Sequence, residues 1–169
     1  MEQLIQWIIQ RLGQVPGLKY VAYNWGQLDY YDTPMPPVQW PCALIEVQQA
    51  NYTNLGLLQQ QGVITLGVVV AAMPIGNTSA QAPAAQVQQA LAWWQLLEAV
   101  HKALHGQQPV NGSQQPVSGP LSRTMGRRLR RDDGIQCWEL SYQCGLHELV
   151  APEAVKQAAS LKLIKPDVL

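Results

Sequence analysis

Arginine is the chemically active residue type that is most concentrated in this sequence. Five of the eleven basic residues fall within nine positions: Arg123, Arg127, Arg128, Arg130 and Arg131. Guanidinium groups at this density are typical of phosphate binding. They are equally typical of a solvated edge strand, whose charges prevent edge-to-edge pairing and form ion pairs with the neighbouring Asp132 and Asp133. No aromatic residue interleaves the arginines as in a dedicated single-strand binder, so sequence-specific recognition of nucleic acid is not expected.

Two histidines form a second candidate site. His101 and His105 are four residues apart, with Glu98 one turn earlier, a spacing that can place two imidazoles on one metal ion. No third ligand is visible in the sequence, and a histidine at a helix end also complements the helix dipole. We therefore predict no metal site.

The remaining polar residues suggest no catalytic machinery. The sequence holds no P-loop, GxSxG, GxGxxG or catalytic carboxylate pair. His147 and Glu148 are an isolated pair at a predicted strand end and are interpreted as surface residues. We predict no catalytic residues, no cofactor and no enzymatic activity.

The three cysteines, Cys42, Cys137 and Cys144, show no metal-type spacing. Their odd number argues against a secreted disulfide framework and favours a reducing compartment. Cys137 and Cys144 differ in parity along one predicted strand, so they should face opposite sides of a sheet.

Charge is scarce in this chain. Only 13% of the 169 residues are charged, compared with about 25% in an average domain. The formal net charge is zero and the pI is about 6.8, so copies repel each other little and self-association is expected. No signal peptide and no run of about 18 apolar residues is found, which predicts a soluble protein without a membrane partner.

The longest helical pattern runs from Gln86 to Gly106, where glycine suits a left-handed C-cap. Apolar residues at three- and four-residue steps predict a core-facing side: Val87, Ala90, Leu91, Trp94, Leu97 and Leu104. A second apolar stripe comprises Trp93, Leu96, Val100 and Ala103. The two stripes together are wider than the single face that a surface helix buries. We therefore predict that Trp93, Leu96 and Val100 of the second stripe contact a neighbouring subunit.

Strand patterns precede and follow this helix. After a short amphipathic helix over residues 4–12, strands are predicted at 19–28, 42–47 and 59–72. The strand at 59–72 is apolar on both faces, which predicts a central strand covered by helices on one side and by a partner on the other. Between the first two of these strands, prolines make residues 29–41 an irregular excursion, which is not needed to connect the strands in a compact domain.

A hairpin is predicted near the end of the chain. Its arms, 121–130 and 135–149, flank Asp132-Asp133-Gly134, a strong turn signal. The second arm alternates cleanly, with one face formed by Trp138, Leu140, Tyr142, Cys144 and Leu146. Residues 107–120 are rich in Gly, Pro, Ser, Asn and Gln and are predicted to form a mobile surface loop.

The element order is α-β-β-β-α-β-β. Consecutive strands favour antiparallel pairing, so we predict an α+β fold with a mostly antiparallel sheet and both helices packed on one face. Residues 1–148 form a single domain in this prediction, and residues 149–169 form a C-terminal extension or arm.

Three local patterns accompany this order: VITLGVVVAAMP with a turn rich in Asn, Ser and Ala, ALAWWQLLEAVHKALHG, and GPLSRT followed by RRDDGIQCWELSYQCGL. The combination resembles the tail terminator or tail completion proteins of long-tailed bacteriophages, over residues 1 to about 148. The resemblance implies a structural protein that forms a ring, typically a hexamer, at the head-proximal end of a tail tube. There it stops tube polymerisation and joins the tail to the neck.

The resemblance also implies partners and a location. The partners are other copies of the chain, the tail tube protein and a neck or connector protein, and the location is the tail–neck junction of the virion after assembly in the host cytoplasm. The five arginines would face either passing DNA, contacted non-specifically, or another subunit. Residues 149–169 do not match the family pattern and are expected to reach a neighbouring subunit or an adjoining ring.

Two alternatives remain open. The first is another phage component, such as a neck, head-closure or tail-tube protein. The second is a small ligand-binding domain or enzyme with a site in the long loops, which would show convergent polar groups in a pocket.

Overall fold

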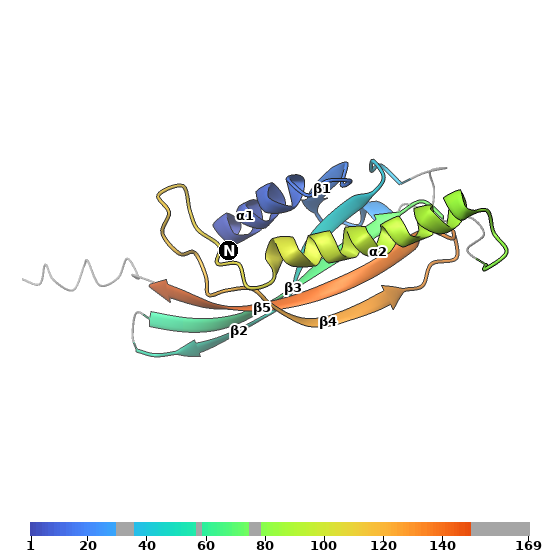
Figure 1. Cartoon of the computed structure of the whole chain (residues 1–169). Coiled ribbons are helices and arrows are strands. Elements are labelled where there is room, and N and C mark those ends of the chain that lie inside the picture. The colour runs from blue at the N-terminus through green and yellow to red at the C-terminus, as the bar shows by residue number, and fades with distance from the viewer. Residues whose placement is uncertain (30–35, 57–58, 75–78, 150–169) are drawn as a thin grey trace, which may run out of the picture.

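The computed structural model describes residues 1–29, 36–56, 59–74 and 79–149. Along the chain it contains α1 (Glu2–Gly13), β1 (Tyr20–Tyr23), the 3-10 helix η1 (Gln27–Asp29), β2 (Cys42–Asn54), β3 (Gln59–Ala72), α2 (Ala84–Leu104), β4 (Ser122–Leu129) and β5 (Gln136–Leu149). The strands form one sheet in the order β1-β2-β3-β5-β4, and both helices lie on one of its faces (Figure 1). The predicted α+β fold is confirmed. The predicted arm falls on residues 150–169, outside the described part of the chain.

β3 is the central strand, as predicted. It pairs antiparallel with β2 on one side and with β5 on the other. Alternate residues, including Ile64, Leu66 and Val68, are buried against α1 and α2. Val69 and Ala71 are buried on the opposite face, which we call the far face because it points away from both helices.

The pairing of β1 differs from the prediction. β1 runs parallel to β2, whereas consecutive strands were expected to pair antiparallel. A parallel pair requires a crossover connection, and residues 24–41 supply it. Leu28, Val38 and Trp40 of this connection pack on the far face. The prediction that residues 29–41 are an excursion not needed for connectivity is therefore wrong.

β2 continues well beyond its predicted end at Val47. A register irregularity between Val47 and Gln49 marks a β-bulge, after which the strand runs to Asn54. Residues 48–54 are exposed, and this outer half of the β2–β3 hairpin extends past the helices together with the end of β5 (Figure 1). Most of the segment between the two predicted strands therefore belongs to β2.

The face that α2 presents to the core only partly matches the one that the spacing predicts, since Leu97 and Leu104 are buried as expected. Leu91 is 47% exposed and Trp94 is 54% exposed, so their predicted core positions are wrong. The buried side chains are those of Trp93, Leu96, Leu97, Val100 and Leu104. Apolar residues occur almost all around this helix, so periodicity alone does not select the buried side.

The segment between α2 and β4 is more ordered than a mobile loop. Gly106 has a φ of 74°, the left-handed conformation expected after the helix. The backbone N–H of Leu121 donates to the carbonyl of Gln107 at 2.9 Å. Val110 and Pro116 form an isolated bridge within the loop. Residues 107–120 therefore form a closed, hairpin-like loop in place of the predicted mobile loop.

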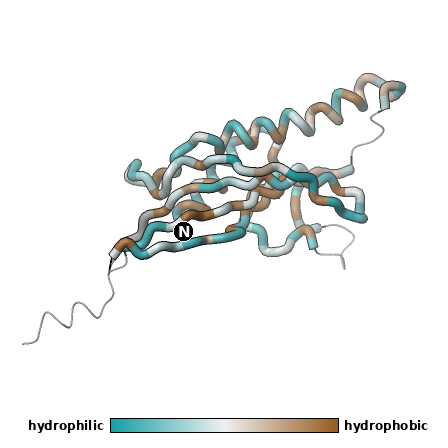
Figure 2. The backbone as a smooth tube through the Cα atoms, turned by 90° about the horizontal axis from the view of Figure 1, so that it is seen from below, coloured by the Kyte–Doolittle hydropathy of each residue, from teal (hydrophilic) through white to brown (hydrophobic). Residues whose placement is uncertain are grey.

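The β4–β5 hairpin is confirmed. Gly134 in the turn has a φ of 75°, which the Asp-Gly pair anticipates. Leu140, Tyr142 and Leu146 of β5 are buried against the helices. Figure 2 shows the turn that joins the two strands as a hydrophilic end of the sheet. Neither helix in the described ranges has the length and apolarity that crossing a bilayer requires.

A matched pair of substitutions on α2 tests its observed orientation. Leu104→Ala removes a side chain that is 1% exposed and should lower the free energy of unfolding by about 2–5 kcal/mol, because it leaves a cavity. Leu91→Ala should change it by less than about 0.5 kcal/mol. Urea denaturation measures both, and equal effects would contradict the observed buried face.

Candidate functional site at the arginine-bearing edge strand

β4 is an edge strand that carries most of the arginine cluster. It pairs with β5, and no other described strand lies beyond it. Its residues from Ser122 to Arg128 are exposed. This agrees with the edge-strand alternative for the arginines and places their charges where they oppose pairing with another sheet.

The register of β4 separates the arginines between the two faces of the sheet. Arg123 lies opposite Tyr142 and Arg128 lies opposite Trp138, so both share the helix-facing side. Arg127 lies opposite Glu139 on the far face. The cluster is therefore not one continuous basic surface.

Arg127 belongs to a polar network on the far face. Its guanidinium Nε donates to Glu139, whose side chain is only 3% exposed. The Gln48 amide donates to the same carboxylate and, at 3.3 Å, to Glu46. Asn24 donates to Glu46 at 2.9 Å. The network thus links the crossover connection, β2, β5 and β4.

A glycine of β3 lets this network cross the sheet. Gln48 sits at the β-bulge of β2, and its side chain passes over Gly67 to reach Glu139. A Cβ at Gly67 would lie 2.6 Å from Gln48 Nε2. Any larger residue here would displace the end of the Gln48 side chain, and an isolated glycine in a strand pattern often indicates such a close approach. The prediction overlooked this signal and, with it, Gln48 and Glu46.

Arg131 holds the β4–β5 turn against the crossover connection. Its guanidinium donates to the carbonyl of Leu28 and binds the Asp133 carboxylate at 2.7 Å. Asp29 lies 3.8 Å away. The hydrogen bond from Arg131 lowers the pKa of Asp133 below its ordinary value. Arg131 is 9% exposed at its side chain, so its role in this structure is to fasten the fold.

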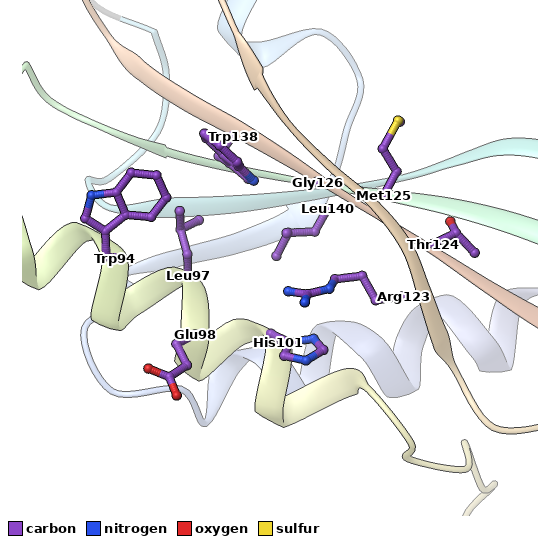
Figure 3. Close-up of a pocket in the computed structure, with 10 residues that line it drawn as sticks. All are labelled: Trp94, Leu97, Glu98, His101, Arg123, Thr124, Met125, Gly126, Trp138 and Leu140. Carbon is purple, nitrogen blue, oxygen red and sulfur yellow. The ribbon is translucent and has the colours of Figure 1, made fainter.

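On the helix-facing side, α2 and β4 enclose a groove of about 670 Å³. We call it the α2–β4 groove. Its residues include Trp94, Leu97, Glu98, His101, Arg123, Thr124, Met125, Gly126, Trp138 and Leu140. Figure 3 shows the Arg123 guanidinium reaching toward His101, while Met125 points away from α2. The Trp94 and Trp138 rings meet edge to face with centroids 5.3 Å apart.

The histidines come together at the end of this groove. The rings of His101 and His105 are 4.7 Å apart. His105 Nδ1 accepts a hydrogen bond from the backbone N–H of Arg123 at 3.1 Å, and Glu98 pairs with Lys102 at 2.7 Å. Burial, together with the nearby Arg123, lowers the pKa of His101. Within the described ranges no three potential metal ligands cluster.

Trp93 and Leu96 border a different recess, of about 650 Å³, between α2, the end of α1 and the end of β3. Each is 8% exposed, and Val100 is fully buried inside the chain. A subunit contact at Trp93 and Leu96 stays a prediction, whereas Val100 offers no surface to a neighbour. The exposed apolar residues of α2 are Leu91 and Trp94.

The cysteines occupy both faces of the sheet. Cys42 and Cys137 lie in the far-face cluster and Cys144 lies in the helix-facing cluster, so the predicted parity is confirmed. Burial raises the pKa of Cys42 to about 12 and that of Cys137 to about 11. These thiols therefore remain protonated and act as core residues.

A double-mutant cycle tests the Arg127–Glu139 pair. Arg127→Met should destabilise the fold by about 1–3 kcal/mol, because it leaves the buried Glu139 carboxylate without its cation. Adding Glu139→Gln should recover part of the loss, since a neutral amide needs no counter-charge. Arg128→Met, on the same strand, is the control and should change stability by less than about 0.5 kcal/mol. Equal effects of the two arginine substitutions would count against the network.

Comparison with known proteins identifies the family. The sequence profile of the family described as "Phage tail terminator protein" matches residues 3–149. No curated protein matches the chain. A similar solved structure is a chain of the "Virion of native gene transfer agent (GTA) particle", with 13% sequence identity over 83% of this chain and 84% of that chain and a TM-score of 0.42. The profile covers almost all of the described residues, and the chain therefore belongs to the phage tail terminator protein family.

Proposed function

We propose that this chain forms a closed ring, of six copies, on the head-proximal end of a phage tail tube. The ring stops further addition of tube protein and then joins the tail to a neck or connector protein. The observation that carries this proposal is the family match over residues 3–149. As a member of the family, the chain is a structural protein of a phage tail and a component of the virion.

The surface chemistry supports assembly with other subunits. The formal net charge is zero, so like-charge repulsion between copies is weak. Large apolar side chains are exposed at several separate places, among them Leu91 and Trp94 on α2, Tyr52, Leu55 and Val63 at the outer β2–β3 hairpin, and Tyr23 and Trp25 at the end of β1. A head-to-tail ring requires different, complementary surfaces on one chain, and separate apolar patches can supply them.

The two alternatives differ from this proposal in their assembly. A tube protein would polymerise into open cylinders, and a neck or head-closure protein would not bind bare tube ends. The family match is to a phage tail protein, which favours a structural role. We therefore favour a mechanical role without catalysis or cofactor.

Light scattering and negative-stain imaging test the ring. Purified protein mixed with tail tubes should give discrete rings that cap tube ends, and adding it to polymerising tube protein should shorten the tubes. Long open-ended cylinders of the chain alone would indicate a tube protein instead. A monomer that neither caps nor shortens tubes would contradict termination.

The arginine cluster contributes a second, separable part of the proposal. Arg127 and Arg131 are engaged within the chain, and Arg123 lines the α2–β4 groove. We propose that the exposed Arg128 and Arg130 contact passing DNA without sequence preference. The alternative is that they contact a neighbouring subunit.

Salt dependence of DNA binding distinguishes these roles. The double substitution of Arg128→Ser and Arg130→Ser should weaken binding to duplex DNA and reduce the slope of log K against log salt by about 0.9 for each lost phosphate contact. Lys19→Ser with Lys102→Ser removes the same charge elsewhere and is the control. An unchanged slope in the arginine variant, together with loss of the ring, would assign these arginines to a subunit contact.

A further inference from the structure

The α2–β4 groove is a recess of about 670 Å³ on the helix-facing side, and no described segment of the chain fills it. We propose that it binds the C-terminal segment, residues 150–169, of a neighbouring copy. This inference rests on the proposed ring and names the surface by which one copy holds the next. Four observations carry it.

The first observation is that part of the groove wall is apolar. Trp94 and Leu97 of α2 and Trp138 and Leu140 of β5 form this part, beside the polar Glu98, His101, Arg123 and Thr124. Trp94 is 54% exposed although its ring edge contacts Trp138. An exposed indole beside a recess of about 670 Å³ is typical of a surface that another chain covers.

The second observation is the open edge of β4. An extended segment that lies along this edge adds a strand to the sheet, and every second side chain then points into the groove. Gly126 keeps the entrance open on that side. A Cβ at this position would approach within 3.1 Å of the Trp138 indole nitrogen. A larger residue would occupy the place of the incoming side chain.

The third observation is the sequence that follows β5. In the stretch Ser160 to Lys165, SLKLIK, Leu161 and Leu163 are two positions apart, with Lys162 between them. If the stretch is extended, Leu161, Leu163 and Lys165 fall on one side, and Ser160, Lys162 and Ile164 fall on the other. The two leucines match the apolar part of the groove wall. The lysine has the opposite charge to Glu98, which lines the groove and is 62% exposed at its side chain.

The fourth observation is where β5 ends. Leu149 pairs with Gln59 at the outer end of the sheet, whereas Trp138 and Leu140 lie nine to eleven residues earlier on the same strand. This separation corresponds to about 30–36 Å. β5 therefore ends far from the groove of its own chain. In a head-to-tail ring the receiving surface belongs to the next copy, and the twelve residues from Leu149 to Leu161 can span at most about 40 Å.

Cysteine crosslinking of the full-length protein tests this arrangement. A variant with Trp94→Cys and Leu163→Cys should give a ladder of covalently joined copies on a denaturing gel after treatment with a short bismaleimide. The three native cysteines are buried and should react little. Met73→Cys with Leu163→Cys is the control, because Met73 is 47% exposed outside the groove, and it should give no ladder.

The crosslinked products also identify any other occupant. A fast-migrating monomer, joined within one chain, would overturn docking on a neighbour. A ladder from Trp94→Cys with Leu55→Cys, in place of Leu163→Cys, would show that the β2–β3 hairpin end of another copy fills the groove and would overturn the proposal as well.

A substitution in the segment gives an independent measure. Leu163→Asp should weaken self-association at least tenfold in light scattering, whereas Ser160→Asp, with the same added charge on the other side of the stretch, should leave it nearly unchanged. Two results together would overturn this inference and leave the proposed ring in place: intact rings of the Leu163→Asp variant, and no ladder from the separate variant with Trp94→Cys and Leu163→Cys. Monomers of the unmodified protein at all concentrations would overturn both.

Discussion

The fold depends on one requirement: β3 is apolar on both faces, and both faces must be buried. α1 and α2 cover one face, where Ile64, Leu66 and Val68 are at most 1% exposed. Both α-helices of the described residues lie on that face. The inner half of the far face is covered instead by the crossover connection, through Leu28, Val38 and Trp40. The parallel pairing of β1 with β2 follows from this, because a chain that crosses the sheet to cover it re-enters in the same direction.

Beyond the reach of this cover, polar residues take over the far face. Glu139 is 2% exposed, and a buried carboxylate is stable only with counter-charge and hydrogen bonds. Arg127 provides them from the adjacent β4, and Gln48 provides them from β2, across β3. The same contacts attach an edge strand whose own side chains bury little surface. The arginines of β4 thus serve two purposes, since they oppose pairing at the open edge and also fasten that edge to the sheet.

Local chemistry explains which parts of the fold could be predicted from the sequence. β3 and the Asp-Gly turn were located correctly because alternation and turn residues are local signals. The buried face of α2 could not be chosen, because Leu91 and Trp94 are apolar yet exposed. The outer half of β2 was missed because the bulge at Gln48 interrupts its alternation. At the candidate site the arginines were evident, but Glu139 and Gln48 are 91 residues apart in sequence, so only the folded chain shows that they are partners.

Ring assembly places a specific demand on such a chain. A subunit that uses one surface twice forms a dimer, whereas a closed ring needs a projecting surface on one side and a receiving surface on the other. In the proposed ring the C-terminal segment is the projecting element, and the α2–β4 groove, about 30 Å back along β5 from Leu149, is the receiving one. The groove has an apolar part at Trp94, Leu97, Trp138 and Leu140 and a polar part at Glu98, His101, Arg123 and Thr124. A partner bound there would therefore be held by burial of apolar surface and selected by charge.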